Sequence, residues 1–64
     1  MELGTELKRI RVIEAKKTQL TLAKESNITP HHLRMIESGK SQPSLPVLEK
    51  LLQNLGYRID LVKV

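Results

Sequence analysis

The chain has 64 residues, a formal net charge of +4 and no cysteine. A chain of this length forms at most one small domain, which buries only about 60% of the surface of its unfolded state. The lack of cysteine excludes disulfides and thiolate zinc sites as sources of extra stability.

Other broad classes are also disfavoured by the composition. No apolar run approaches the roughly 20 residues that span a bilayer, and the N-terminus has no signal-peptide pattern. No phosphate loop and no set of nucleophile, base and orienting group is recognisable. We therefore expect a cytoplasmic protein that is not an enzyme, needs no cofactor and does not contact a membrane.

Apolar residues recur at helical spacing in the first part of the chain. The pattern predicts a first helix over about 5–15, capped by Thr5, and a second over about 19–25, capped by Thr18. The residues expected to face the core are Leu7, Ile10 and Ile13 in the first helix and Leu20 and Ala23 in the second, with Leu22 as a further candidate.

A tight turn and a third helix follow. Asn27 tolerates the positive φ that such a turn requires, and Thr29 can cap a helix whose first residue is Pro30. Leu33 and Ile36 are spaced to face inward on this helix. Glycine commonly ends a helix, and Gly39 is expected to end this one.

A fourth helix is expected to begin at Ser44 and to end at Gly56. Its predicted apolar stripe consists of Leu45, Leu48, Leu51, Leu52 and Leu55. With one aromatic residue in the whole chain, the core must be built from aliphatic side chains, which suits packed helices.

The last eight residues, YRIDLVKV, change period. Apolar side chains alternate with Arg58 and Asp60, which is typical of a strand, here over about 57–63. A lone strand leaves its N–H and C=O groups unpaired, so we expect it to pair with the same strand of a second copy. The residues expected at this dimer interface are Tyr57, Ile59, Leu61 and Val62. The alternative is a frayed or helical tail.

Two short helices joined by a three- or four-residue turn can place the second helix in the major groove of DNA. Residues 18–38 fit this unit, and residues 16–42 carry five basic side chains against two acidic ones. His31, His32 and Arg34 can donate hydrogen bonds from the outer side of the third helix. The alternative is a solvated surface without a partner, on which the histidines are exposed and have no binding role.

The segment TQLTLAKESNITPHHLRMIESGKSQPSL resembles the Xre/Cro-type helix-turn-helix repressors over residues 18–45, without a gap. The shared pattern is Ser/Thr-Gln, Leu-Ala, a turn, a cap, Ile-Glu-x-Gly-Lys and Pro-Ser-Leu. The resemblance implies an all-α, lambda-repressor-like DNA-binding domain of four to five helices over residues 1–64. It also implies a nucleoid-associated repressor that binds a palindromic double-stranded DNA operator as a homodimer.

The resemblance also implies roles for individual residues. Those expected to read bases are Thr29, Pro30, His31, His32 and Arg34. Those expected to contact phosphates are Thr18, Gln19, Lys40, Ser41 and Gln42. Glu37 is expected to form a structural pair with an arginine of the first helix, either Arg11 or, as the fallback, Arg9. The chain departs from the pattern at Lys17, where an apolar residue is common, and its connection before the second helix is one residue longer.

Two further readings follow from the histidines and the tail. Adjacent helical residues diverge by about 100°, so His31 and His32 are not expected to share a metal. Protonation of these two imidazoles would be expected to tighten DNA binding. In having a strand after the fourth helix, the chain is similar to the HipB-type antitoxins, which bind a HipA-like kinase toxin. The alternative function is a protein-interaction module with only non-specific affinity for DNA.

Overall fold

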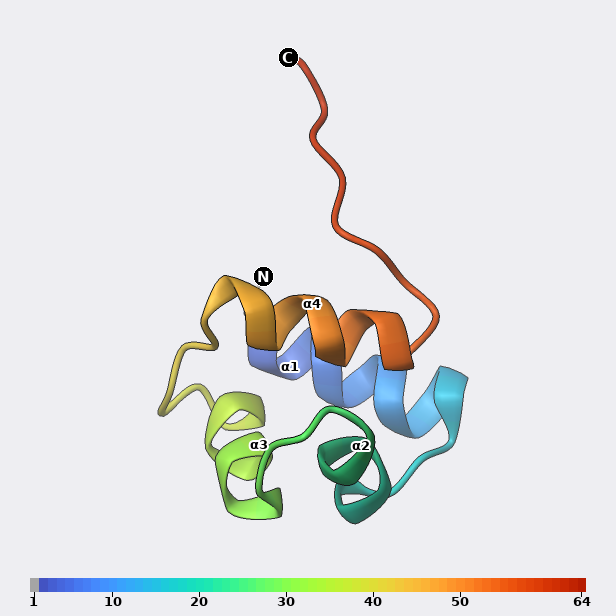
Figure 1. Cartoon of the computed structure of the whole chain (residues 1–64), viewed down its shortest axis with the longest axis vertical. Helices are drawn as coiled ribbons and strands as arrows, with labels where there is room; N and C mark the ends of the chain where they lie inside the picture. The colour runs from blue at the N-terminus through green and yellow to red at the C-terminus, as the bar shows by residue number, and fades with distance from the viewer. Residues whose placement is uncertain (1) are drawn as a thin grey trace.

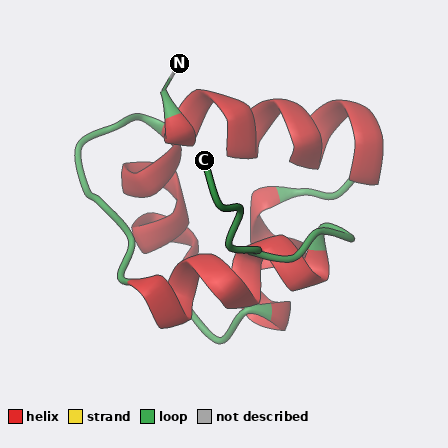
Figure 2. Ribbon diagram, turned by 90° about the horizontal axis from the view of Figure 1, so that it is seen from above, coloured by secondary structure: helices red, strands yellow, loops and turns green. Residues whose placement is uncertain are grey.

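The computed structural model describes residues 2–64. It consists of α1 (Leu3–Arg9), a π-helix η1 (Ile10–Ala15), α2 (Gln19–Glu25), α3 (Pro30–Glu37) and α4 (Leu45–Asn54). α1 and η1 form one continuous rod, and α2 and α3 pack beneath this rod and α4 (Figures 1 and 2). The expected all-α class is confirmed, and the described part of the chain contains no strand.

The core is small and entirely aliphatic. Each helix contributes side chains to it, and Leu22, Leu33 and Leu51 have no exposed surface. Complete burial of one such side chain stabilises the fold by roughly 1.5–3 kcal/mol. The buried apolar residues are Leu7, Ile10, Leu22, Ala23, Leu33, Ile36, Leu51 and Leu55.

Three of the four predicted caps are confirmed. The hydroxyls of Thr18, Thr29 and Ser44 each accept a hydrogen bond from the backbone N–H three residues later, at 3.1, 3.0 and 3.4 Å. Each bond satisfies one of the free donors at the start of a helix. The predicted cap at Thr5 is wrong, because α1 already begins at Leu3 and Glu2 takes the N-cap position.

The second half of the first rod also differs from the prediction. Residues Ile10–Ala15 wind as a π-helix, whose turn contains more residues than an α turn. A three-residue step from Ile10 therefore no longer returns to the core side, and Ile13 is 64% exposed, contrary to prediction. Arg11 is buried instead, and Lys16 ends the rod in the left-handed region at φ 54°.

Two further leucines predicted in the core lie on the surface. Leu20 is 65% exposed, because α2 turns the adjacent pair Leu22 and Ala23 inward and a residue two positions earlier points away. Leu45 is 60% exposed, because the first turn of α4 lies beside the C-terminal tail and not over the core.

The tail after α4 runs away from the helices (Figure 1). Its first residue is fixed, because Tyr57 N donates to Leu52 O at 2.8 Å and Tyr57 Oη donates to Glu14 Oε1 at 2.6 Å. Beyond it the chain is open to solvent, with Leu61 97% and Val62 82% exposed. Within residues 2–64 this segment has no strand partner, so pairing across a dimer stays a prediction.

The contact of Tyr57 with Glu14 can be tested by pH. The hydrogen bond to the carboxylate, with partial desolvation, raises the pKa of Tyr57 above its ordinary value of about 10. A raised native pKa means that the contact stabilises the fold at pH values below about 10, and that this stabilisation is lost as pH rises through the native pKa.

Tyr57 is the chain's one aromatic residue, so phenolate absorbance in the ultraviolet reports it alone. We expect Tyr57 to ionise at higher pH in the native protein than in urea, and Glu14→Gln to remove most of this difference. Identical titrations of native and unfolded protein would show that the contact is not kept in solution.

Candidate nucleic-acid interface

α2 and α3 form a helix-turn-helix. The turn is closed by the amide of Ile28, which donates to the carbonyl of Ala23 at 3.0 Å, and Asn27 adopts the predicted left-handed conformation at φ 58°. α3 then starts at Pro30 behind its Thr29 cap. In this arrangement the N-terminal residues of the second helix are placed to reach base edges in a major groove.

The two sides of α3 have different roles. Leu33 and Ile36 are completely buried against the rest of the domain, at 0% and 1% exposure. On the other side His31 and Arg34 are exposed and His32 is half-buried. Of the remaining residues expected to read bases, Thr29 is exposed and Pro30 is half-buried. The helix therefore presents hydrogen-bond donors outward from a fixed position.

A buried ion pair holds the end of α3 to the first rod. Arg11 Nε donates to Glu37 Oε2 at 2.7 Å and Arg11 Nη2 donates to Glu37 Oε1 at 3.1 Å. The third donor of this guanidinium, Nη1, reaches the carbonyl of Lys17 at 2.8 Å. Arg9, the other candidate, pairs with Glu6 and Glu14 on the surface. Arg11 is therefore the arginine that contacts Glu37.

Gln19, the first residue of α2, joins the same pair. Its amide Nε2 donates to Glu37 Oε1 at 2.9 Å. Among the described residues no buried side-chain nitrogen or oxygen lacks a partner, so the network is complete. Glu37 thus fixes the start of α2 against the last turn of α3, which is the end of α3 that precedes Lys40.

The loop after α3 carries the other residues expected to contact phosphates. The amides of Lys40 and Ser41 both donate to Met35 O, at 3.0 and 3.2 Å, and fold the loop back onto α3. Lys40 and Gln42 are exposed and Ser41 is half-buried. The predicted phosphate contacts from α2 and from this loop therefore flank the same end of α3.

Ion pairing leaves the helix-turn-helix more basic than its sequence suggests. Both acidic residues of segment 16–42 are used internally: Glu37 by Arg11, and Glu25 by Lys17, whose Nζ lies 2.8 Å from Glu25 Oε1. Within segment 16–42, four exposed cations form no ion pair with any described residue, namely Lys16, Lys24, Arg34 and Lys40. A surface with free cations and no free acid is the electrostatic footprint expected for a polyanion partner.

Lys17 has a role that the sequence did not reveal. Its Nζ donates to Asn54 O at 2.7 Å as well as to Glu25, so it links the end of α4 to α2. The signal was present as a departure, a lysine where the resemblance favours an apolar residue. In this chain the position is a polar clamp between helices.

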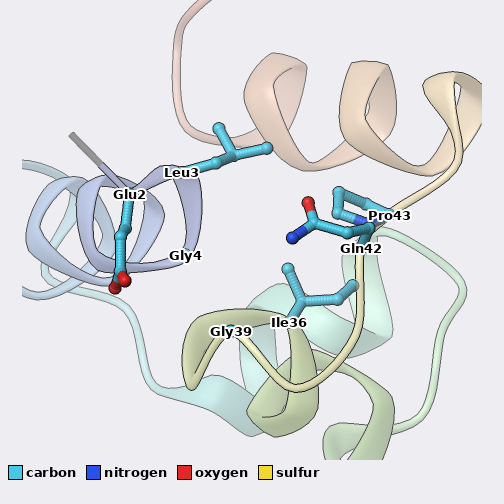
Figure 3. Close-up of a pocket in the computed structure, with 7 residues that line it drawn as sticks. All are labelled: Glu2, Leu3, Gly4, Ile36, Gly39, Gln42 and Pro43. Carbon is cyan, nitrogen blue, oxygen red and sulfur yellow. The ribbon is translucent and has the colours of Figure 1, made fainter.

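A ligand cavity, a metal site and a membrane span have less support in the structure than a nucleic-acid interface. A cavity of about 390 Å³ lies between the start of α1, the end of α3 and the following loop (Figure 3). No three His, Asp or Glu residues within 2–64 lie close enough together to hold a metal ion. No helix in the described segment is long and apolar enough to cross a membrane.

Comparison with known proteins agrees with this geometry. A family model described as helix-turn-helix matches residues 7–62, a range that includes η1, α2, α3 and α4 in full. No curated protein and no solved structure gives a match.

Proposed function

Because the chain belongs to the Xre/Cro-like helix-turn-helix family of DNA-binding transcription regulators, which are generally not enzymes, we propose that it is a repressor that binds a palindromic operator as a homodimer. Its place of action would be the nucleoid in the cytoplasm. The observation that carries the proposal is α3, with a buried anchoring side and an exposed side of donors beside unpaired cations.

Within this proposal the residues divide into two groups. Those that read base edges are Thr29, Pro30, His31, His32 and Arg34. Those that bind phosphates are Thr18, Gln19, Lys40, Ser41 and Gln42. Phosphate contacts supply affinity without sequence information, and base contacts supply specificity. In a two-fold dimer the two α3 helices would lie about 34 Å apart, one turn of DNA.

The test is fluorescence anisotropy with two duplexes, the DNA upstream of the protein's own gene and a scrambled copy, each at low and at moderate salt. We expect tight binding to the first duplex alone that persists at moderate salt. Phosphate contacts make affinity fall steeply with salt for any duplex. Equal, salt-sensitive binding to both duplexes would overturn the proposal of a specific operator.

Arg34 gives the sharpest test of base reading. Its guanidinium is exposed on α3 without an ionic partner among the described residues, and arginine can donate two bonds to one guanine. Arg34→Ala should lose about 1–3 kcal/mol at the preferred site and relax specificity there.

The matched control is Lys50→Ala, which also removes one exposed cation from a helix, but from α4, across the molecule from α3 (Figure 1). It should change affinity for both duplexes little. If Arg34→Ala weakened binding to both duplexes equally, Arg34 would be a phosphate contact.

A second candidate function is that of an antitoxin that also binds a kinase-type toxin, or an interaction module with only non-specific DNA affinity. The exposed apolar tail favours it, since Leu61 and Val62 have almost no cover in one chain. Co-expression with the protein encoded next to this chain's gene tests it. A stable complex that Arg34→Ala leaves intact would support it, and separate elution would count against it.

A further inference from the structure

The C-terminal tail has two chemically different sides. By alternation Tyr57, Ile59 and Leu61 fall on one side of an extended tail: Tyr57 bonds Glu14, and the other two line a groove with Leu45 of α4. This groove has a volume of about 310 Å³ and is also lined by Glu49, Gln53 and Arg58. The groove is open to solvent in one chain: Leu45 is 60% exposed and Leu61 is 97% exposed.

Arg58 and Asp60 alternate with these apolar residues. Arg58 Nη2 lies 3.7 Å from Asp60 Oδ2, and the two side chains are 85% and 69% exposed. A single exposed pair of this kind contributes little to stability. The order of the charges is more informative, because the positive Arg58 directly precedes Ile59 and the negative Asp60 directly follows it.

That order is self-complementary. When two identical strands pair antiparallel, residues at equal distances on either side of the two-fold axis lie opposite each other. With the axis at Ile59, Arg58 of each chain lies opposite Asp60 of the other, and both ion pairs form. Tyr57 then lies opposite Leu61.

Other positions of the axis are less favourable. An axis at Asp60 places that carboxylate opposite its own copy, and an axis between Asp60 and Leu61 places Arg58 opposite Lys63. Like charges directly opposite each other are destabilising. An axis between Leu61 and Val62 does pair Asp60 with Lys63, but it puts odd-numbered residues of one strand on the same face as even-numbered residues of the other. Charged side chains would then enter the apolar face.

We propose that two copies of this chain pair as antiparallel strands over residues 57–61 with the two-fold axis at Ile59. The inference rests on the proposed homodimer and specifies its interface. Tyr57, Ile59 and Leu61 of both chains then form one apolar face directed at the two α4 grooves, and Arg58 and Asp60 form the solvent face. Gly56, at φ 89°, cannot continue the strand and ends the ladder.

Charge reversal tests the register. Arg58→Asp and Asp60→Arg each place like charges opposite each other twice per dimer, so each variant should dimerise about tenfold more weakly. A mixture of the two variants should form a heterodimer about as tightly as the unaltered protein, because both cross-strand pairs are restored. Loss of the contact within one chain cannot explain that rescue. Sedimentation equilibrium measures all three.

Lys63→Asp is the matched control, since it reverses a tail charge outside the proposed ladder and should leave dimerisation unchanged. Strong weakening by Lys63→Asp, with none by Arg58→Asp, would move the axis to Leu61 and Val62 and overturn the proposal. Rescue failing in the mixture would overturn it as well.

Cysteine cross-linking gives an independent readout, because the chain has no cysteine of its own. Ile59→Cys should form a disulfide with its own copy on mild oxidation. Leu61→Cys should not, because the two copies would be about 13 Å apart along the ladder, too far for a disulfide. The opposite pattern would overturn the register. A purely monomeric protein would overturn the strand pairing itself, while DNA anisotropy would still decide whether the domain binds an operator.

Discussion

Replacing Glu37 with alanine should remove most of the stability of this domain. The substitution leaves the Arg11 guanidinium, 7% exposed, without a counter-charge. Breaking a buried ion pair in this way costs about 3–5 kcal/mol. A domain of this size has a total of only about 3–10 kcal/mol. Urea unfolding followed by far-ultraviolet circular dichroism would measure the loss, and a midpoint at a much lower urea concentration than that of the unaltered protein is the expected result.

Two further variants show whether the pair acts through its burial. Glu49→Ala removes an exposed acid from α4 and should change stability by less than about 0.5 kcal/mol. The double variant Arg11→Met with Glu37→Leu removes both charges and fills their space with apolar atoms, so it should recover most of the loss. A loss below about 1 kcal/mol for Glu37→Ala would mean that water reaches the pair in solution.

The double variant also separates folding from DNA binding. It would fold without the carboxylate that Gln19 donates to at 2.9 Å, so the start of α2 would no longer be tied to α3. We expect such a protein to bind its operator more weakly at unchanged helical content. Unchanged affinity would mean that Gln19 is placed by its helix alone.

The helix-turn-helix was the part best predicted from sequence, because its signals are local. A capping hydroxyl acts on an amide three residues away, as at Thr29, and Pro30 fixes its own φ. Asn27 needs only its own turn to take φ 58°. Because each of these interactions lies within one turn of the chain, distant parts of the fold have little influence on the local conformation.

The errors lie where distant segments decide the outcome. The sequence showed only a connection one residue longer than the family pattern, whereas the structure has a π-helix at Ile10–Ala15, whose turn holds more residues than an α turn. The exposure of Ile13 depends on which turn of the helix contains the additional residue. Lys17 likewise gains its role from Asn54, at the other end of the chain.

The predicted burial of Leu45 on α4 was wrong for a related reason. Leu45 fits the helical stripe by spacing, and a stripe does not reveal where the neighbouring helices end. In the structure this leucine lies beside Ile59 and Leu61. A second copy would cover an apolar residue that one chain leaves exposed, so the position of Leu45 is consistent with the dimer interface proposed above.

Gly4 provides the second large effect, and no pattern in the sequence singled it out. In an ordinary helix interior, replacing glycine with alanine stabilises by about 1 kcal/mol. Here α1 passes over the end of α3, with Gly4 on the side of Ile36 (Figure 3). The two backbones are so close that an added Cβ would contact the backbone oxygen of Ile36 and lie 2.8 Å from that of Glu37. Backbone atoms cannot rotate away as a side chain can.

Gly4→Ala should therefore cost about 1–3 kcal/mol, the usual range for overpacking, which reverses the sign expected from helix propensity. The displaced backbone would be that of Ile36 and Glu37, so DNA affinity should fall together with stability. Thr5→Ala is the control: it lies next along the same helix, is exposed, and should change stability by less than about 0.5 kcal/mol. Urea unfolding of both variants gives the comparison. A Gly4→Ala protein more stable than the unaltered chain would show that α1 and α3 lie further apart in solution, and that the contact beside Glu37 does not hold α3 in place.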